Sequence, residues 1–186
     1  MASSASGART ASFSATIPLL ADEWQLLARL STAIPMDIAG LCETVSRIME
    51  VNPDEVGFLK VRGLSLEFIF PFALKSAGRI SLCSAAVAAR TATSGKSELF
   101  NNFSKVPHNS VFELVPLGES SDSAHPQHIQ RLISVPVWDA NRKTIGVIQI
   151  SRKGRTPAEA GAEFMEKDME KLCGVAHALS SFFEAL

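Results

Sequence analysis

Two apolar runs joined by a short polar segment decide the fold: RLISVPVW (131–138) and TIGVIQIS (144–151), separated by DANRK (139–143). Each run has the length of a strand and is rich in β-branched residues, and the five residues between them fit a hairpin turn. Within the apolar stretches, polar Ser134 and Gln149 are the interruptions. Strands this apolar suit the centre of a sheet with at least one face well covered, so we predict a central antiparallel pair.

Helices are predicted at both ends of the chain. Residues 22–33 begin with Asp22 as an N-cap, and residues 37–50 place apolar side chains at 3.6-residue spacing. Residues 163–186 carry a broad apolar stripe and are predicted as one last helix.

The remaining elements lie between these helices and the central hairpin. Residues 56–70 predict a second hairpin, followed by a short extended piece at 79–83. Ser84 is positioned to cap a helix over 85–94, which Gly95 would end. The order of elements predicts an α+β fold in which helices cover an antiparallel sheet.

Composition limits the class of protein. With 186 residues, 46% of them hydrophobic and 20% charged, the chain fits one globular domain. The net charge of -1 gives no general attraction for nucleic acid or an anionic membrane, and no apolar run is long enough to span a membrane. Residues 1–21 are rich in Ser and Ala and are predicted to be a disordered tail before a single domain at 22–186.

Three cysteines occur, and none forms a CxxC pair. Widely spaced and odd in number, they suit a reducing compartment, so we predict a cytoplasmic protein. His125 and His128 have the spacing of a metal-ligand pair, but no Cys or carboxylate cluster accompanies them, and no metal site is predicted.

The order of several motifs resembles the GAF domain family. RLISVPV (131–137), IGVIQI (145–150) and Lys153 resemble the C-terminal half of that domain. TSGK (93–96) and the following SELFNN (97–102) resemble its helix end and the short strand after it. The resemblance covers roughly residues 35–186.

This resemblance implies a central antiparallel sheet of about five or six strands with the terminal helices on one face. A ligand pocket would lie on the other face, beneath the helix at 84–95 and the loop at 102–128. The implied function is a sensory or regulatory module that binds an unidentified small molecule and signals through a partner protein or a homodimer. The resemblance does not identify a cofactor.

Some positions depart from the family pattern. The turn before Ile-Gly-Val usually carries a Gly, where this chain has Arg142, so we expect a different turn because a bulky residue disfavours positive φ. Members that bind cyclic nucleotides share a signature in which this chain has Arg152 for Asn and Met169 for Glu. No Cys is followed by His, as in bilin-binding members. Neither ligand is therefore expected.

Candidate ligand-binding residues follow from the expected pocket. Each has an alternative role: the phenylalanines can fill the core, the asparagines can form turns, and a buried Ser can bond to neighbouring groups. The imidazole of His108 could donate to an anionic or carbonyl ligand. The candidates are Phe70, Phe72, Val87, Asn101, Asn102, His108 and Ser134.

The apolar faces of the terminal helices suggest an interface. Candidate dimer residues are Trp24, Leu27, Leu179 and Phe183, with packing inside one chain as the alternative.

No catalytic motif is present, so we predict a protein that is not an enzyme. One alternative is an interaction or dimerisation module with a filled, ligand-free core. Another is a free methionine sulfoxide reductase, because some GAF-type proteins have that activity. It requires an attacking and a resolving thiol in one pocket, whereas here only Cys83 lies near the expected pocket.

Overall fold

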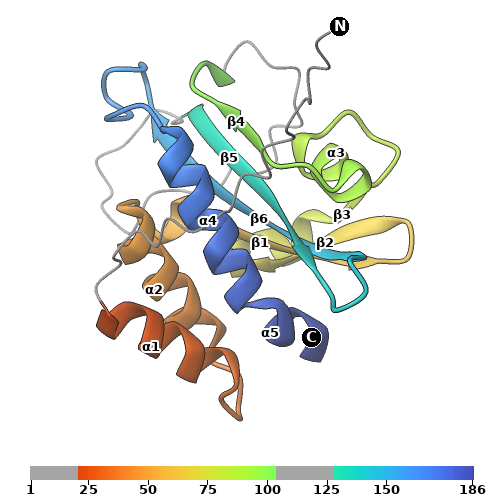
Figure 1. Cartoon of the computed structure of the whole chain (residues 1–186). Coiled ribbons are helices and arrows are strands. Elements are labelled where there is room, and N and C mark those ends of the chain that lie inside the picture. The colour runs from red at the N-terminus through yellow and green to blue at the C-terminus, as the bar shows by residue number, and fades with distance from the viewer. Residues whose placement is uncertain (1–20, 104–127) are drawn as a thin grey trace, which may run out of the picture.

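A computed structural model of the chain describes residues 21–103 and 128–186 (Figure 1). Within these ranges, six strands form one antiparallel sheet in the order β3-β2-β1-β6-β5-β4. The strands are β1 (Val56–Arg62), β2 (Ser65–Phe70), β3 (Arg79–Ser81), β4 (Glu98–Phe100), β5 (His128–Trp138) and β6 (Thr144–Gly154). The helices are α1 (Ala21–Ser31), α2 (Ile38–Met49), α3 (Val87–Ser94), α4 (Glu166–Ala178) and α5 (Ser180–Ala185), with 3-10 turns η1 (Pro53–Glu55) and η2 (Phe72–Ala77).

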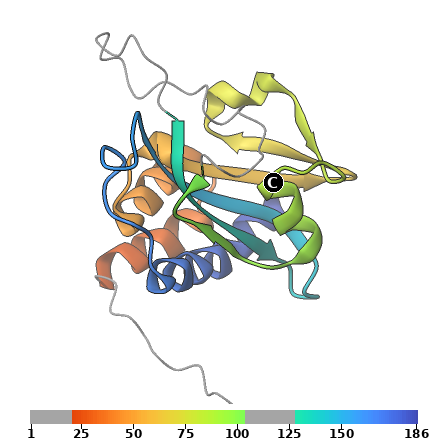
Figure 2. The same cartoon turned by 90° about the horizontal axis from the view of Figure 1, so that it is seen from above.

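The two faces of the sheet carry different helices, as predicted. The terminal helices α1, α2, α4 and α5 gather on one face, and α3 lies on the other (Figures 1 and 2). Each face has its own apolar cluster: Phe58, Ile133 and Ile148 pack toward the terminal helices, and Leu59 and Val147 pack toward α3. We call the second side the α3 face. In the described helices, none is long and apolar enough to cross a membrane.

The central hairpin is confirmed and is longer than predicted. β5 and β6 pair from His128–Gly154 to Trp138–Thr144. The expectation of a different turn was wrong, because Arg142 adopts the left-handed φ of 63° that a Gly would take. The Asp139 carboxylate accepts from the main-chain N–H of Asn141 and of Lys143, each at 2.9 Å, and so holds the turn closed around Arg142.

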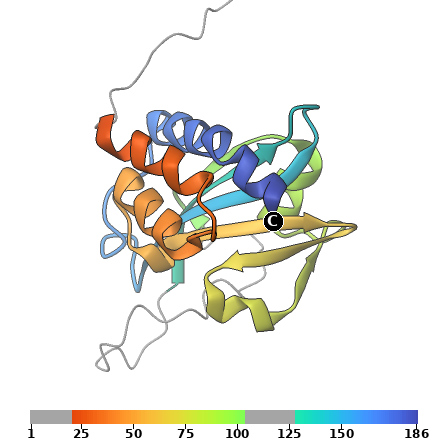
Figure 3. The same ribbon diagram turned by 90° about the horizontal axis from the view of Figure 1, so that it is seen from below.

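The C-terminal helix was wrongly predicted as one piece from residue 163. α4 begins at Glu166, where Asp168 Oδ2 accepts from Met165 N at 2.8 Å, and it ends before Leu179. α5 then runs toward β1 (Figure 3), where Lys60 Nζ donates to the Phe183 carbonyl. The break brings Phe183 against Gly146, where any Cβ would overlap its ring.

α3 also starts later than predicted. It begins at Val87 with Ala86 at the N-cap position, so Ser84 is not its cap. Ser84 instead donates its main-chain N–H to the Ser81 carbonyl at 3.0 Å, which closes the turn after β3. Gly95 ends the helix with φ 64°, as predicted.

Three of the four candidate dimer residues pack inside their own chain, which is the alternative given for them, and the dimer itself stays a prediction. Leu27, Leu179 and Phe183 are fully buried in the apolar cluster of their own chain. Trp24 is half-buried and lies over Gly174 of α4. The apolar stripes of the terminal helices are therefore used for packing within the chain. Residues 1–20 lie outside the described residues, so the disordered tail stays a prediction.

Candidate functional site

A row of polar side chains crosses three strands on the α3 face. Gln149 of β6 is the direct partner of Ser134 on β5, and Ser134 is the partner of Glu98 on β4. Residues that are direct partners in an antiparallel sheet project to the same face. Leu132 and Val147, two residues away from Ser134 and Gln149, belong to the apolar cluster under α3, so the row faces that helix.

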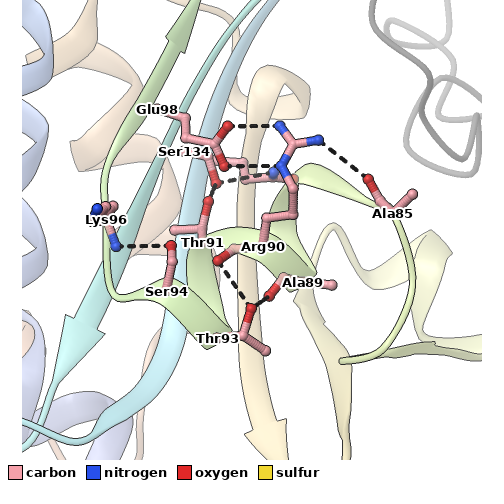
Figure 4. A network of polar contacts seen from close by, with 10 residues as sticks. Ala85, Ala89, Arg90, Thr91, Thr93, Ser94, Lys96, Glu98 and Ser134 are labelled. Atoms are coloured by element: carbon pink, nitrogen blue, oxygen red, sulfur yellow. Dashed lines mark hydrogen bonds and ion pairs between the residues drawn. The ribbon is translucent and has the colours of Figure 1, made fainter.

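The inner part of this row is a buried hydrogen-bond network (Figure 4). Ser134 Oγ lies 2.8 Å from Thr91 Oγ1 of α3, and Gln149 Nε2 donates to Ser134 Oγ at 3.2 Å. Ser134 and Thr91 are fully buried, and Gln149 is 6% exposed. Burial of polar groups is costly unless they are paired, so this network fixes the position of α3 over the sheet.

The outer part of the row is an ion pair at the rim. Two guanidinium nitrogens of Arg90 in α3 contact the two carboxylate oxygens of Glu98, with Nη2–Oε2 at 2.6 Å and Nε–Oε1 at 3.4 Å (Figure 4). The Arg90 guanidinium also lies 5.9 Å from the centre of the Phe100 ring. The two side chains are partly exposed, so they bring charge to the edge of the buried network.

Gln149 retains an unused acceptor. Its Oε1 accepts no hydrogen bond from any other residue in the described ranges. Its partner on β1 is Gly57, which has no side chain to cover it. A carbonyl oxygen beside a glycine is a suitable contact for a small donor group.

The other predicted ligand residues are dispersed. Val87 is buried in the apolar cluster under α3, Asn102 is exposed, and His108 lies outside the described residues. The side-chain amide of Asn101 both donates to the carbonyl of Phe164 and accepts from its N–H, each at 2.9 Å. Asn101 thus joins β4 to the segment before α4.

Phe68, Phe70 and Phe72, which alternate along the sequence, do not share one face of the sheet. Leu59 pairs with Phe68 and Phe58 with Phe70, so Ile69 is an extra residue that shifts the register of β2. As a result Phe68 points toward α3, whereas Phe70 packs with the cluster under the terminal helices. Phe72, in η2, is 48% exposed. Phe68 and Phe70 therefore fill the core, which is one of the two roles considered for the phenylalanines.

Thr91, Arg90 and Glu98 belong to this site but were not among the residues predicted from the sequence. Arg90 gave a usable signal as the one charged residue of α3, whereas Thr91 could not be told from Thr93 by residue type. Their partners on β4 and β5 lie 8 and 43 residues further along the chain.

The three cysteines lie on different elements. Cys42 is buried in α2, where burial raises the pKa of its thiol and nearby Asp37 adds to the effect. Cys173 is half-buried in α4, with its Sγ 3.4 Å from Ser97 Oγ, and Cys83 is exposed just after β3. Among the described residues, no group of three or more His, Cys, Asp or Glu side chains could hold a metal ion.

Comparison with known proteins identifies the fold. No protein-family model matches the chain, and no curated protein matches it by sequence. The GAF domain of an Acinetobacter phosphoenolpyruvate-protein phosphotransferase superposes with a TM-score of 0.64 at 13% identity, over 88% of this chain and 92% of that one. The fold is GAF-like.

Other GAF-like structures include both a further GAF domain and an enzyme. The nlh2 GAF domain of A. aeolicus, in an inactive state, has a TM-score of 0.54 at 15% identity, covering 88% of this chain and 94% of that one. The free methionine-R-sulfoxide reductase of Neisseria meningitidis, in complex with its substrate, has a TM-score of 0.56 at 21% identity, with coverages of 88% and 89%. Identities this low establish the shared GAF-like fold alone.

Proposed function

We propose that this GAF-like domain is a non-catalytic sensory or regulatory module that binds a small polar molecule on its α3 face. The observation that carries the proposal is the buried row of Thr91, Ser134 and Gln149. The ligand would donate a hydrogen bond at the Gln149 end, where the amide oxygen is unused and the neighbouring residue on β1 is Gly57. Occupancy would be passed to a partner protein through α3 or the strands beneath it.

The asymmetry of the two sheet faces supports this proposal. The face under the terminal helices is filled by large apolar side chains such as Phe58, Phe182 and Phe183. The α3 face instead buries two hydroxyls and an amide at its centre. A core needed only for stability gains little from such groups, because apolar residues of the same shape would serve as well.

A matched pair of glutamine variants tests the proposal. Gln149→Leu removes the amide at the row, and Gln130→Leu removes another buried amide on the neighbouring strand, whose Nε2 donates to the Gly154 carbonyl at 3.0 Å. Native mass spectrometry of the freshly purified chain, followed by thermal unfolding with a metabolite library, would identify the ligand. We expect Q149L to lower the affinity for that ligand at least tenfold, which corresponds to about 1.4 kcal/mol of binding free energy. Q130L should leave the affinity unchanged.

Equal binding by Q149L and the parent chain would reject the row as a ligand site. Absence of any co-purifying mass and of any ligand-dependent stabilisation would favour the alternative, an interaction module whose α3 face is a filled core. Val87, Ala88, Leu59 and Leu66 already pack together there.

A reductase for free methionine sulfoxide is the competing enzymatic function. Reduction of a sulfoxide by thiols needs two of them to form a disulfide, and the chain has three cysteines in all. Cys42 and Cys173 lie on helices of the terminal-helix face, whereas Cys83 follows β3 on the edge next to α3. This separation supports a non-catalytic module.

A thiol titration discriminates between the two functions. In the native chain we expect Cys83 to react rapidly with an aromatic disulfide reagent, Cys173 more slowly, and Cys42 only after unfolding, because the buried thiol remains protonated. Turnover of methionine sulfoxide by the purified chain, abolished in Cys83→Ser, would replace the sensory proposal with the reductase.

A further inference from the structure

Two arginines lie side by side at the end of the central hairpin, away from the α3 face. Arg131 of β5 and Arg152 of β6 are direct cross-strand partners. Both project toward the terminal-helix side, because Ile133 and Ile150, two residues away, belong to the cluster under those helices. Like charges placed directly opposite each other in a sheet destabilise it unless something compensates them.

No described carboxylate forms an ion pair with either guanidinium. Arg131 Nη1 donates to the Pro157 carbonyl at 2.8 Å, and Arg152 Nη1 donates to the Ala162 carbonyl. The Arg152 guanidinium also lies 4.5 Å from the centre of the Phe164 ring. Main-chain carbonyls and a ring face carry partial negative charge, so two full positive charges are left without a full counter-charge.

Arg131 also has an unused donor. The residue is only 6% exposed, and its buried Nε has no hydrogen-bond partner among the described residues. A guanidinium remains ionised in proteins and presents its donors as a planar fork that matches two oxygens of a phosphate or carboxylate. A buried donor of this kind, next to a second arginine, is suited to an oxyanion.

A cleft of about 440 Å³ opens at the same place. Arg152 and Lys153 line it together with residues 159–162, which belong to the segment whose carbonyls hold the two arginines. Acidic residues border it as well: Glu55 is bonded to the main-chain N–H groups of Asn52 and Lys153, and Glu159 to that of Arg155. Glu50, at the end of α2, also lines the cleft and is exposed.

We propose that Arg131 and Arg152 form an anion-binding site for the phosphate or carboxylate group of a small ligand, entered through this cleft. Arg152 lines the cleft and makes the first contact, and Arg131, its buried cross-strand partner, supplies the second donor. The site lies on the opposite face of the sheet from Thr91, Ser134 and Gln149. The test of this site is therefore independent of the function proposed above.

Thermal unfolding of the full chain in rising inorganic phosphate, with ionic strength held constant by sodium chloride, tests the site. A ligand that binds only the folded state raises the unfolding temperature in a saturable way. We expect this response in the parent chain and at least a tenfold weaker phosphate affinity in Arg152→Gln. The control is Arg142→Gln, at the other end of the same hairpin, where the guanidinium lies over Trp138. A parallel titration with acetate distinguishes a carboxylate group from a phosphate group as the preferred ligand.

If Arg131 and Arg152 only hold residues 157–162 in place through their carbonyls, the result is different. R152Q would then lower the unfolding temperature by the same amount with and without phosphate or acetate, and the parent chain would show no saturable response. That outcome, or an equal loss of response in R142Q, overturns the proposal. Isothermal titration of phosphate into the folded parent chain and R152Q gives the same comparison without unfolding either protein.

Discussion

Arg142 shows how one residue can hold a conformation that its own type disfavours. Its φ of 63° lies in the left-handed region, where a side chain with a Cβ costs about 1–2 kcal/mol. The Asp139 carboxylate holds the turn through two main-chain N–H groups, and the Arg142 guanidinium lies 5.8 Å from the centre of the Trp138 ring. The surrounding hairpin thus imposes the turn on an unsuitable residue.

Two substitutions at this position separate backbone strain from side-chain contact. Arg142→Gly and Arg142→Ala both remove the contact with Trp138, but only Gly relieves the strain. We expect R142G to be more stable than R142A by about 1 kcal/mol in the free energy of unfolding, measured with urea. Equal stabilities would show that the turn relaxes to negative φ when Arg142 is replaced.

At the scale of elements, single polar side chains join pieces that the chain order keeps apart. Asn101 follows β4 and pairs with both main-chain groups of Phe164, 63 residues later. Ser180 Oγ, at the start of α5, donates to the Trp138 carbonyl at the end of β5 at 2.5 Å. These links fix where α4 and α5 start on the sheet.

Replacement of Asn101 measures one such link. In Asn101→Ala, the N–H and carbonyl of buried Phe164 lose their partner, and we expect the free energy of unfolding to fall by about 1–3 kcal/mol. Asn102→Ala, at the exposed neighbouring position, is the control and should cost less. Hydrogen exchange at the Phe164 amide should become faster in N101A but not in N102A, which would show that the lost stability comes from this link. Unchanged exchange in N101A would contradict this prediction.

At the scale of the whole molecule, Glu55 connects the helical layer to the sheet. Its Oε2 accepts from Asn52 N at 2.9 Å, just after α2, and its Oε1 accepts from Lys153 N at 2.6 Å, on β6. Burial raises the pKa of Glu55 above its ordinary value of 4.5, although these hydrogen bonds act in the opposite direction. Burial likewise raises the pKa of neighbouring Asp54, which Lys153 partly offsets.

The raised pKa values predict how stability depends on pH. A carboxyl whose pKa is higher in the folded state holds its proton there over a range in which the unfolded chain has lost it. The free energy of unfolding should therefore fall as pH rises through the range directly above 4.5, and this part of the slope should be smaller in Glu55→Gln. Urea unfolding across that range, with exposed Glu170→Gln as the control, measures the difference. Parallel slopes for the parent chain and E55Q would contradict the assignment.

The sequence by itself determined the central hairpin, the helices α1 and α2 and the layered α+β arrangement, because these depend on periodic apolar patterns and turn residues within short stretches. It also singled out Ser134 and Gln149, since polar residues inside apolar strands are conspicuous. Only the tertiary structure decided what those residues meet. Thr91 reaches Ser134 across 43 residues, and Arg131 becomes the neighbour of Arg152 through strand register.

The difference between local sequence and tertiary contacts also explains which sequence-based predictions were wrong. The extra residue at Ile69 moved Phe70 to the other face, and packing against Gly146 and Lys60 directed α5 away from the axis of α4. A one-residue shift in register or a break in a helix costs little locally, so local sequence does not specify it. The choice is made by contacts between segments that are distant along the chain, and these exist only once the sheet and helices have packed.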